Sequence, residues 1–397
     1  MTSITGDQSL LKQINRMALV RAVQRRPALS RADLAKHTGL TKSTVSLLVQ
    51  ELIDEGWLAE GSAQTTGALG RRPTPLFLSH DQMAILGGEI EVDRIRVVAV
   101  SLEGELLDVC STTILEPPSQ EMILKELAAL ITGCASRMIA AERQILGLGL
   151  GVPGAVDQAT GLLKVAPNLG WRNLHLADQL RPVLERCGLE ACPIFVQNEA
   201  DVAALGAFEF GERPVAEPLI YISLGVGVGA GIIANDRLFT GCDGFAGEVG
   251  HSILQVDGPR CSCGRKGCAE AFIGLRAICD RVASCHRNPE KLVQLAHQND
   301  PEAVRAIVDA GHHLGILLQN LWTAFNPGRM VVGGPTCNLG AVFMEAALES
   351  LQSYADDAGL PAPEVCVSPH GQNAVSIGAA AMVLHHLLRP FAAAAAG

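Results

Sequence analysis

The first eighty residues carry a pattern of apolar and polar positions that predicts three helices. Pro27 stops the first helix, in which apolar residues recur at helical spacing at Leu10, Ile14, Met17 and Val20. Ser30 is placed to cap a second, short helix over residues 31–37, and Thr41 is placed to cap a third helix that ends near Glu55. A glycine lies in the turn between the second and third helices. This segment is therefore predicted to form a small helical head.

The third predicted helix has an apolar side and a polar side. Its apolar stripe consists of Val45, Leu48, Val49, Leu52 and Ile53, and its polar side carries Ser43, Ser46, Gln50 and Asp54. A short helix, a turn and a helix with small polar residues in its first turns are typical of a helix-turn-helix, whose second helix enters the major groove of DNA. The residues expected to contact bases or phosphates from this helix are Lys42, Ser43, Thr44, Ser46 and Gln50.

Residues 57–78 predict the short strands of a β-wing. Apolar and polar positions alternate in this segment, and turns are expected at Gly61 and Gly67. Arg71 and Arg72 follow, between a glycine and a proline, on what is expected to be an extended arm. Paired arginines on an extended arm suit a narrow minor groove, so both are expected to contact DNA. The alternative is that three amphipathic helices form a small protein-binding bundle with solvated arginines.

Beyond residue 84 the pattern changes to short apolar strands that alternate with helices. Three strands in a meander are expected first, then a helix over residues 120–142, and then the same order of elements a second time. The expected strands cover residues 84–91, 94–101, 105–113, 145–150, 194–197, 219–224 and 329–332. An order of β-β-β-α-β-α that occurs twice predicts an α/β body with two similar lobes and a cleft between them. The alanine-rich residues 391–397 are expected to be a frayed tail.

Charge separates the head from the body. The chain of 397 residues has a formal net charge of −10, but residues 1–80 hold ten Lys and Arg against six Asp and Glu. The remaining residues hold 21 Lys and Arg against 35 Asp and Glu. A basic head on an acidic body is the asymmetry expected of a separate nucleic-acid-binding domain. Because 48% of the residues are hydrophobic and only 18% are charged, a disordered scaffold is excluded.

The start of the chain lacks the basic and then apolar run that is typical of a signal peptide. The longest apolar stretch, residues 218–234, is interrupted by four glycines, so it predicts strands and turns and not a membrane span. A cytoplasmic protein is therefore expected, with its twelve cysteines mostly reduced.

Four possible metal ligands lie close together in the second half of the chain. Cys261, Cys263 and Cys268 fall within eight residues on a loop with two glycines, and His251 lies ten residues before the first of them. Three cysteines and one histidine make the closed ligand set of a structural zinc site. The alternative is a cluster of unligated thiols, because the spacing is not the common paired Cys-x2-Cys.

These motifs resemble the signature of the ROK family, which comprises repressors, open reading frames and sugar kinases. The resemblance rests on the cysteine run behind Gly-Glu-Val-Gly-His at residues 247–251, and on motifs at residues 151–154, 167–171, 198–200 and 331–334. The opening, residues 8–16, resembles the entry to the winged helix of the family's repressor branch. The resemblance covers about residues 8–388. It implies an actin-like, RNase H-type (sugar-kinase-like) fold with two lobes that bind a sugar between them, usually as a dimer or tetramer.

The resemblance also shows where a kinase of this family would hold ATP. Residues 89–94 read Glu-Ile-Glu-Val-Asp-Arg where the kinases have Asp-x-Gly-Gly-Thr-Lys, so two glycines are missing and extra carboxylates would repel a triphosphate. Residues 225–227 read Gly-Val-Gly in place of Gly-Thr-Gly, and Glu199 takes the place of the catalytic aspartate. These three losses predict that the protein is not a working kinase.

The sugar-holding positions fit the family pattern better. By resemblance, the sugar is surrounded by Gly154, Asn168, Asn198, Glu199, Glu248, His251 and Glu270. Carboxylates and amides suit vicinal hydroxyls, although Glu248 and Glu270 could instead support the metal ligands. Trp171 could stack on the sugar or only pack its loop. Asn-Glu-Ala at residues 198–200 resembles the xylose-repressor branch, which favours xylose or a related sugar.

Together these features predict a sugar-responsive transcriptional repressor, a homodimer or homotetramer that binds double-stranded operator DNA through its head. Sugar is expected to favour an arrangement of the lobes in which the heads are mis-spaced for DNA. The expected domains are a winged helix over residues 1–80, a first lobe over 81–200 with a C-terminal helix over 373–390, and a second lobe with the zinc loop over 201–372. The alternatives are a ROK sugar kinase with an added DNA-binding head, and an interaction module whose head binds protein. The sequence leaves open the operator, the sugar and its phosphorylation state, and the direction of the switch.

Overall fold

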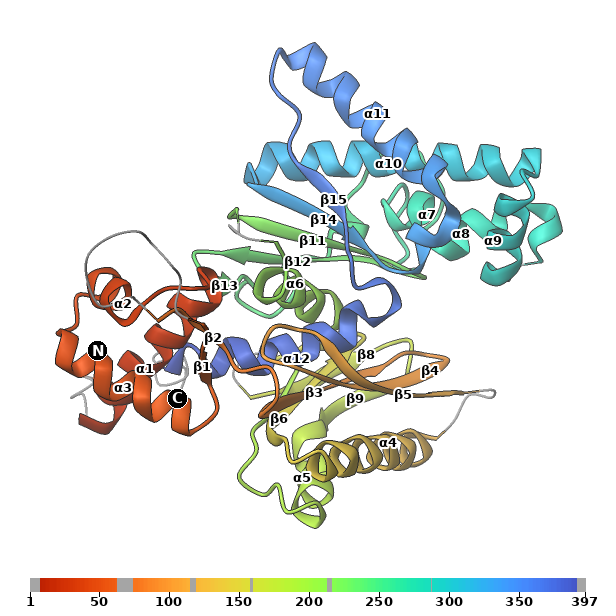
Figure 1. Cartoon of the computed structure of the whole chain (residues 1–397). Coiled ribbons are helices and arrows are strands. Elements are labelled where there is room, and N and C mark those ends of the chain that lie inside the picture. Colours follow the sequence, from red (N-terminus) through yellow and green to blue (C-terminus); the bar gives the residue numbers. More distant parts are fainter. Residues whose placement is uncertain are drawn as a thin grey trace. The chain divides into compact units, whose positions relative to one another are not determined.

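The computed structural model of the chain describes residues 8–62, 74–114, 119–157, 160–212, 216–286 and 288–390. The chain divides into two compact units, each of which is described by itself (Figure 1). Unit 1 comprises Met1–Gln197, Glu212–Pro214 and Ala379–Gly397, and unit 2 comprises Asn198–Gly211 and Val215–Gly378. The head thus falls within unit 1, and the domain boundaries expected near residues 80, 200 and 373 stay predictions. In the described part of the chain, no helix has both the length and the apolar character needed to cross a membrane.

The described residues of the head form three helices and a two-stranded antiparallel sheet. Its elements are α1 (Gln8–Arg25), α2 (Arg31–Thr38), α3 (Lys42–Asp54), β1 (Leu58–Glu60) and β2 (Leu76–Leu78). Both predicted caps are present, because the side chain of Ser30 accepts from the amide of Asp33 and that of Thr41 accepts from the amide of Thr44. The predicted winged helix-turn-helix is confirmed. The expected turn at Gly67 and the arginines Arg71 and Arg72 lie outside the described residues.

The body of unit 1 is built on a five-stranded sheet with the order β10-β6-β3-β4-β5. Its strands are β3 (Met83–Ile90), β4 (Arg94–Val100), β5 (Leu106–Thr113), β6 (Gln144–Val152) and β10 (Ile194–Asn198). Helix α4 (Gln120–Ala140) covers one face of this sheet, and Figure 1 shows α12 (Ala374–Leu387) on the other face. The contact with α12 is so close that a Cβ atom at Gly149 of β6 would lie 1.8 Å from the carbonyl oxygen of Ala379.

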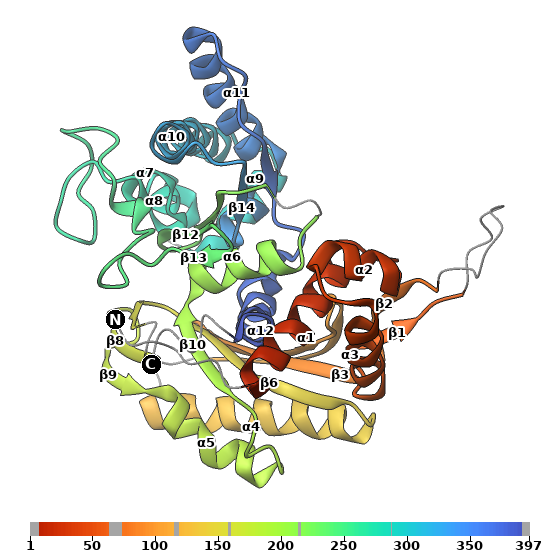
Figure 2. The same ribbon diagram turned by 90° about the vertical axis from the view of Figure 1, so that its left-hand side faces the viewer.

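Unit 2 contains a second five-stranded sheet, with the order β13-β12-β11-β14-β15. Its strands are β11 (Leu219–Leu224), β12 (Val228–Ala234), β13 (Arg237–Leu238), β14 (Arg329–Gly333) and β15 (Val365–Val367). Helix α6 (Glu199–Glu209) packs on β12, while α10 (Pro301–Phe325) and α11 (Ala341–Ala358) lie side by side (Figure 2). Both sheets place their strands in the order third, second, first, fourth and fifth along the chain, which confirms the predicted pair of similar lobes.

Several small elements complete the two units. A three-stranded sheet, which the sequence analysis did not predict, precedes α5 (Leu176–Arg186) in unit 1 and consists of β7 (Ala155–Val156), β8 (Leu162–Ala166) and β9 (Trp171–His175). Trp171 is 5% exposed and belongs to the core of unit 1, so packing is the role that the structure gives it. Unit 2 adds the short helices α7 (Glu270–Ile273), α8 (Leu275–Asp280) and α9 (Pro289–His297).

Candidate functional site

Helix α3 presents most of the residues predicted to contact DNA. The stripe buried in the head consists of Val45, Leu48, Val49 and Leu52, while Ile53 is only half-buried at its side. Lys42, Ser43, Ser46 and Gln50 are exposed, and Thr44 is half-buried. The sequence analysis missed Leu47, which is 62% exposed on the same helix. The sequence could have identified Leu47, because it is an apolar residue outside the apolar stripe of the helix.

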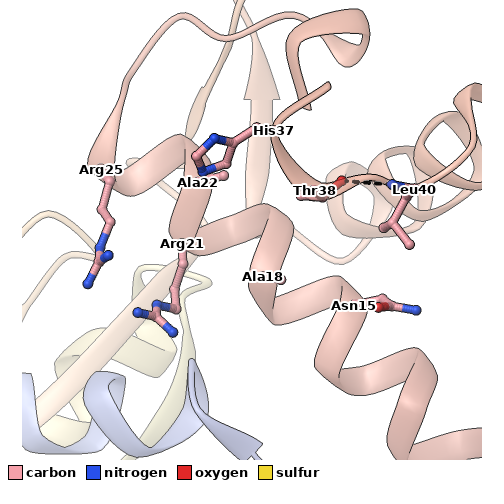
Figure 3. A pocket seen from close by; sticks show the side chains of 8 residues that line it. All are labelled: Asn15, Ala18, Arg21, Ala22, Arg25, His37, Thr38 and Leu40. Carbon is pink, nitrogen blue, oxygen red and sulfur yellow. Dashed lines mark hydrogen bonds between the residues drawn. The ribbon is translucent and has the colours of Figure 1, made fainter. Parts of the chain in front are cut away.

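The head also has a cavity of about 300 Å³ between α1 and the end of α2 (Figure 3). Arg21, Arg25 and His37 line it, and none of the residues predicted to contact DNA does. Arg25 and His37 belong to the last turns of their helices, where a positive charge interacts favourably with the helix dipole. Arg25 and His37 are thus placed to interact with the dipoles of their own helices, and we assign the cavity no ligand.

The four predicted metal ligands come together in unit 2. One ligand atom from each of His251, Cys261, Cys263 and Cys268 lies within 4.8 Å of all the others. The Sγ atoms of Cys263 and Cys268 are 3.7 Å apart, and the Sγ atom of Cys261 is 3.7 Å from Nδ1 of His251. The set could hold a metal ion. It agrees with the sequence-based choice of ligands residue by residue.

Backbone hydrogen bonds within the loop bring the cysteines together. The amide of Cys261 donates to the carbonyl oxygen of Arg265 at 2.8 Å, which closes a tight turn with Cys263 at its tip. The amide of Gly267 donates to the carbonyl oxygen of Pro259 at 2.8 Å. Gly267 has a φ of +72°, and a Cβ atom there would lie 1.6 Å from the carbonyl oxygen of Gln255. Only glycine fits this position, so the glycines of the motif are needed to form the turn.

The three thiols differ in acidity when no metal is bound. Burial raises the pKa of Cys268 to about 12. The backbone amide and then the guanidinium of Arg265 lower the pKa of Cys263 to about 6, and the guanidinium lies 3.4 Å from its sulfur. A bound cation would favour the thiolate form of all three cysteines, so metal binding would release protons.

A second group of possible ligands lies in unit 1, where Asp108 and Cys110 of β5 face Cys134 of α4. The guanidinium of Arg137 donates to the carboxylate of Asp108 at 2.7 Å and also contacts the sulfur of Cys110. Burial raises the pKa of both thiols. Because a cation already pairs with the carboxylate and the thiols favour their neutral form, we assign no metal to this group.

Three of the predicted sugar ligands surround the metal loop in unit 2. Glu270 accepts a hydrogen bond from the Ser262 hydroxyl at 2.7 Å, and its second oxygen is 3.4 Å from the amide nitrogen of Val228. Glu248 lies 3.9 Å from Nε2 of His251, on the side of the ring opposite the thiols. A histidine ligand held by a carboxylate at its other nitrogen is common in metal sites. Glu270 thus contacts the cysteine loop through Ser262, while Glu248 only lies near His251 and has a side chain that is 50% exposed.

The other predicted sugar residues lie at the junction of β10 with α6 or in turns. Asn198 caps α6 by accepting from the amide of Ala200 at 2.8 Å, and Glu199 is the first residue of that helix. Gly154 and Asn168 belong to unit 1, where Gly154 lies just before β7 and Asn168 lies in the turn between β8 and β9. Gly154 has a φ of +107°, and a Cβ atom there would lie 2.1 Å from the carbonyl oxygen of Val165. The backbone conformation at this position and the nearby carbonyl oxygen therefore require a glycine, whether or not a sugar binds.

Asp201 is a buried acidic residue that the sequence analysis missed. It lies in α6, in which every residue from Ala200 to Glu209 is buried, and is itself 7% exposed. Burial, and then the charge of Glu248, raise its pKa from 3.8 to about 8. The signal in the sequence was a carboxylate within a run of apolar helix positions. A raised pKa favours the protonated, neutral form of the Asp201 carboxyl at neutral pH.

We expect the Asp201→Asn substitution to weaken the pH dependence of the stability of unit 2. Because the folded-state pKa of Asp201 lies above its ordinary value, stability should fall as the pH rises from about 4 to 8, by up to about 1.4 kcal/mol per pH unit. Urea unfolding at pH 6, 7 and 8 with saturating metal measures this slope. Asp357→Asn, at an exposed position of α11, should keep the wild-type slope. Equal slopes in the wild type and Asp201→Asn would show that Asp201 is ionised in the folded protein.

Residues 89–94, which were predicted to have lost the phosphate-binding glycines of a kinase, contain a buried ion pair with Arg96. Arg96 of β4 lies 3.2 Å from the carboxylate of Glu89 of β3, with side-chain exposures of 6% and 3%. Burial also raises the pKa of the nearby Glu91. Two carboxylates and the arginine that pairs with one of them thus lie together on β3 and β4.

A winged helix-turn-helix on an actin-like, RNase H-type body defines the class of this protein. The chain belongs to the ROK family, whose model matches residues 85–386, and the model of the MarR family matches residues 13–67. The chain is 32% identical over 400 residues to the xylose repressor of Caldicellulosiruptor bescii, which covers 96% of this chain and 98% of the relative.

The body alone is similar to kinases of the same family. A glucokinase of Halalkalibacterium halodurans is 28% identical over 312 residues, which cover 74% of this chain and 92% of the kinase. Among solved structures, a ROK family transcriptional regulator described as a homologue of the E. coli MLC protein has a TM-score of 0.77 at 23% identity and covers 97% of this chain and 99% of that chain. This last similarity confirms the fold of the head and the body.

Proposed function

We propose that this protein is a sugar-responsive transcriptional repressor that binds operator DNA through α3. The similarity to a repressor along almost the entire chain carries the proposal, because the kinase relative matches only about three quarters of it. The positive charge of residues 1–80 on an otherwise acidic chain supports DNA as the ligand of the head. A homodimer would present two α3 helices to the two halves of an operator.

The DNA-binding surface would consist of the exposed side of α3 and of the wing. We propose contacts by Lys42, Ser43, Thr44, Ser46 and Gln50, and by Arg71 and Arg72 of the wing. Binding of a DNA duplex should weaken steeply with salt, since each neutralised phosphate releases counterions. An interaction module whose head binds protein would show no such binding, so the salt dependence of duplex affinity separates the two functions.

We propose that the sugar is bound by Asn198, Glu199, Glu248, His251 and Glu270 of unit 2. Gly154 and Asn168 stay predicted sugar-binding residues. The polar groups of the unit 2 set, with Asp201 beside them, suit the donors and acceptors of vicinal hydroxyls. Since the C. bescii relative is named a xylose repressor, we favour xylose or a related sugar as the effector.

We propose zinc for the metal site. Sulfur atoms at tetrahedral Zn–S distances of about 2.3 Å lie about 3.8 Å apart, which agrees with the 3.7 Å between Cys263 and Cys268. Nδ1 of His251 and the sulfur atoms of Cys261, Cys263 and Cys268 would fill all four positions. A closed site of this kind is structural, and it would hold the loop from which His251 and Glu270 extend.

Sugar phosphorylation is the second candidate function, because the body is similar to a glucokinase. Glu89, Glu91 and Arg96 argue against it, since a triphosphate would have to approach carboxylates in place of glycine amides. Incubation with ATP, Mg²⁺ and a panel of sugars tests this candidate. Turnover at an ordinary kinase rate of about 1–100 per second would overturn the assignment as a non-enzyme.

A further inference from the structure

Leu47 lies on the side of α3 opposite the side that packs into the head. At about 100° per residue, Leu47 is rotated roughly 200° from Val45, which is fully buried. Ser43, Gln50 and Asp54 share this outer face with it. Leu47 is 62% exposed, so a large hydrocarbon side chain stands at the centre of an otherwise polar surface.

The polar neighbours of Leu47 are engaged along the helix itself. The hydroxyl of Ser43 lies 2.9 Å from that of Thr41, and the amide of Gln50 donates to the carboxylate of Asp54 at 2.9 Å. Helical side chains lean toward the N-terminus, so Leu47 covers the surface above Ser43. In a helix-turn-helix, the first turns of the second helix contact the base edges. Leu47 thus presents an exposed hydrocarbon surface on this face, while Ser43 and Gln50 form hydrogen bonds along the helix.

Charge favours DNA over a second copy of the head as the occupant of this face. The carboxylates of Glu51 and Glu55, at the side and end of α3, pair with Lys12 and Arg16 of α1. The pairing reduces their repulsion of phosphate. Lys42 is exposed at the start of the helix, and the head as a whole carries an excess of basic residues.

We infer that Leu47 contacts the 5-methyl group of a thymine in the major groove and so sets a preference for thymine at that base pair. The inference rests on the proposed function. Thymine is the one base that presents a methyl group in this groove. If a polar base edge faced Leu47 instead, it would lose its bound water without gaining a hydrogen bond, which is unfavourable for binding. Burial of one methyl group corresponds to about a fourfold gain in affinity.

The test uses the full-length protein and duplexes that it selects from a pool with a randomised central segment. Each thymine of the selected duplex is then replaced singly by deoxyuridine, which removes only the methyl group. We expect one position in each half-site at which the wild type loses about fourfold in affinity. Leu47→Ala should bind more weakly and show no further loss at that position, whereas Leu47→Met should keep the loss. Leu11→Ala is the matched control, since Leu11 of α1 is a leucine that is 52% exposed.

Three results would overturn the inference. In the first, Leu47→Ala shows the same loss with deoxyuridine as the wild type. In the second, no thymine of the selected duplex is sensitive although the protein binds the duplex. In the third, Leu47→Ala changes the oligomeric state of the protein and leaves the methyl dependence intact, so the face belongs to a protein interface. If the protein selects no duplex at all, the proposed function fails together with the inference, which distinguishes that result from the other three.

Discussion

Replacing Cys268 by serine is expected to remove the bound metal and to unfold the loop around it. Cys268 is fully buried, and its sulfur lies 3.7 Å from that of Cys263. Loss of a residue that hydrogen-bonds to a metal ligand typically lowers metal affinity by about 10–100-fold. Loss of a ligand itself should therefore lower the affinity by more than about 100-fold. Zinc content should fall from about one ion per chain to almost none. Because the loop positions His251 and Glu270, the response to sugar should be lost as well.

The control for this substitution is Cys242→Ser, at an exposed cysteine of unit 2 outside the ligand set. This variant should keep the metal content and the thermal stability of the wild type. Metal analysis of both variants after gel filtration, together with thermal unfolding, provides the measurement. A Cys268→Ser protein that retains one zinc ion per chain would contradict the assignment of the site.

Replacing Arg96 by methionine should destabilise unit 1 by about 3–5 kcal/mol. The substitution leaves the carboxylate of Glu89, which is 3% exposed, without the partner that now lies 3.2 Å away. For a unit of this size, such a loss corresponds to a decrease in Tm of roughly 6–20 °C. Most of the effect should disappear in the double variant Glu89→Gln/Arg96→Met, because the buried carboxylate is then replaced by a neutral amide.

Arg172→Met, at an exposed arginine of β9, serves as the control and should change the stability little. Chemical unfolding of the two single variants and the double variant gives the coupling energy between Glu89 and Arg96. A coupling energy near zero would show that the pair does not stabilise the strands. The segment would then be free to adapt to phosphate, which would weaken the argument against kinase activity.

Features with a strong local signal could be predicted from the sequence. The caps at Ser30 and Thr41 and the apolar stripe of α3 depend on residues within a few positions of each other. The metal ligands could be identified for the same reason, since Cys261, Cys263 and Cys268 lie on one tight turn. The repeated order of strands could also be predicted from the sequence, because buried strands are recognisable as continuous apolar runs.

Features that depend on distant contacts could not be predicted. The strands β7, β8 and β9 have two to five residues each, too few for a periodic pattern. Glu89 pairs with Arg96 because the register of β3 and β4 places these two residues opposite each other. Asp201 acquires its raised pKa from the burial of α6 and from Glu248, which lies far away along the chain. The apolar positions around Asp201 indicated a buried helix, but nothing near Asp201 in the sequence indicated the influence of Glu248.

The central claim is that a sugar bound by the body changes the affinity of the head for DNA. The most direct test is the affinity of the full-length protein for a selected duplex at fixed salt, with D-xylose, glucose and N-acetylglucosamine added in turn. One of these sugars should change the affinity by about 5–150-fold. The change should be absent in Glu199→Ala and present in Glu349→Ala, at an exposed glutamate of α11. An affinity for DNA that no sugar alters would contradict the account.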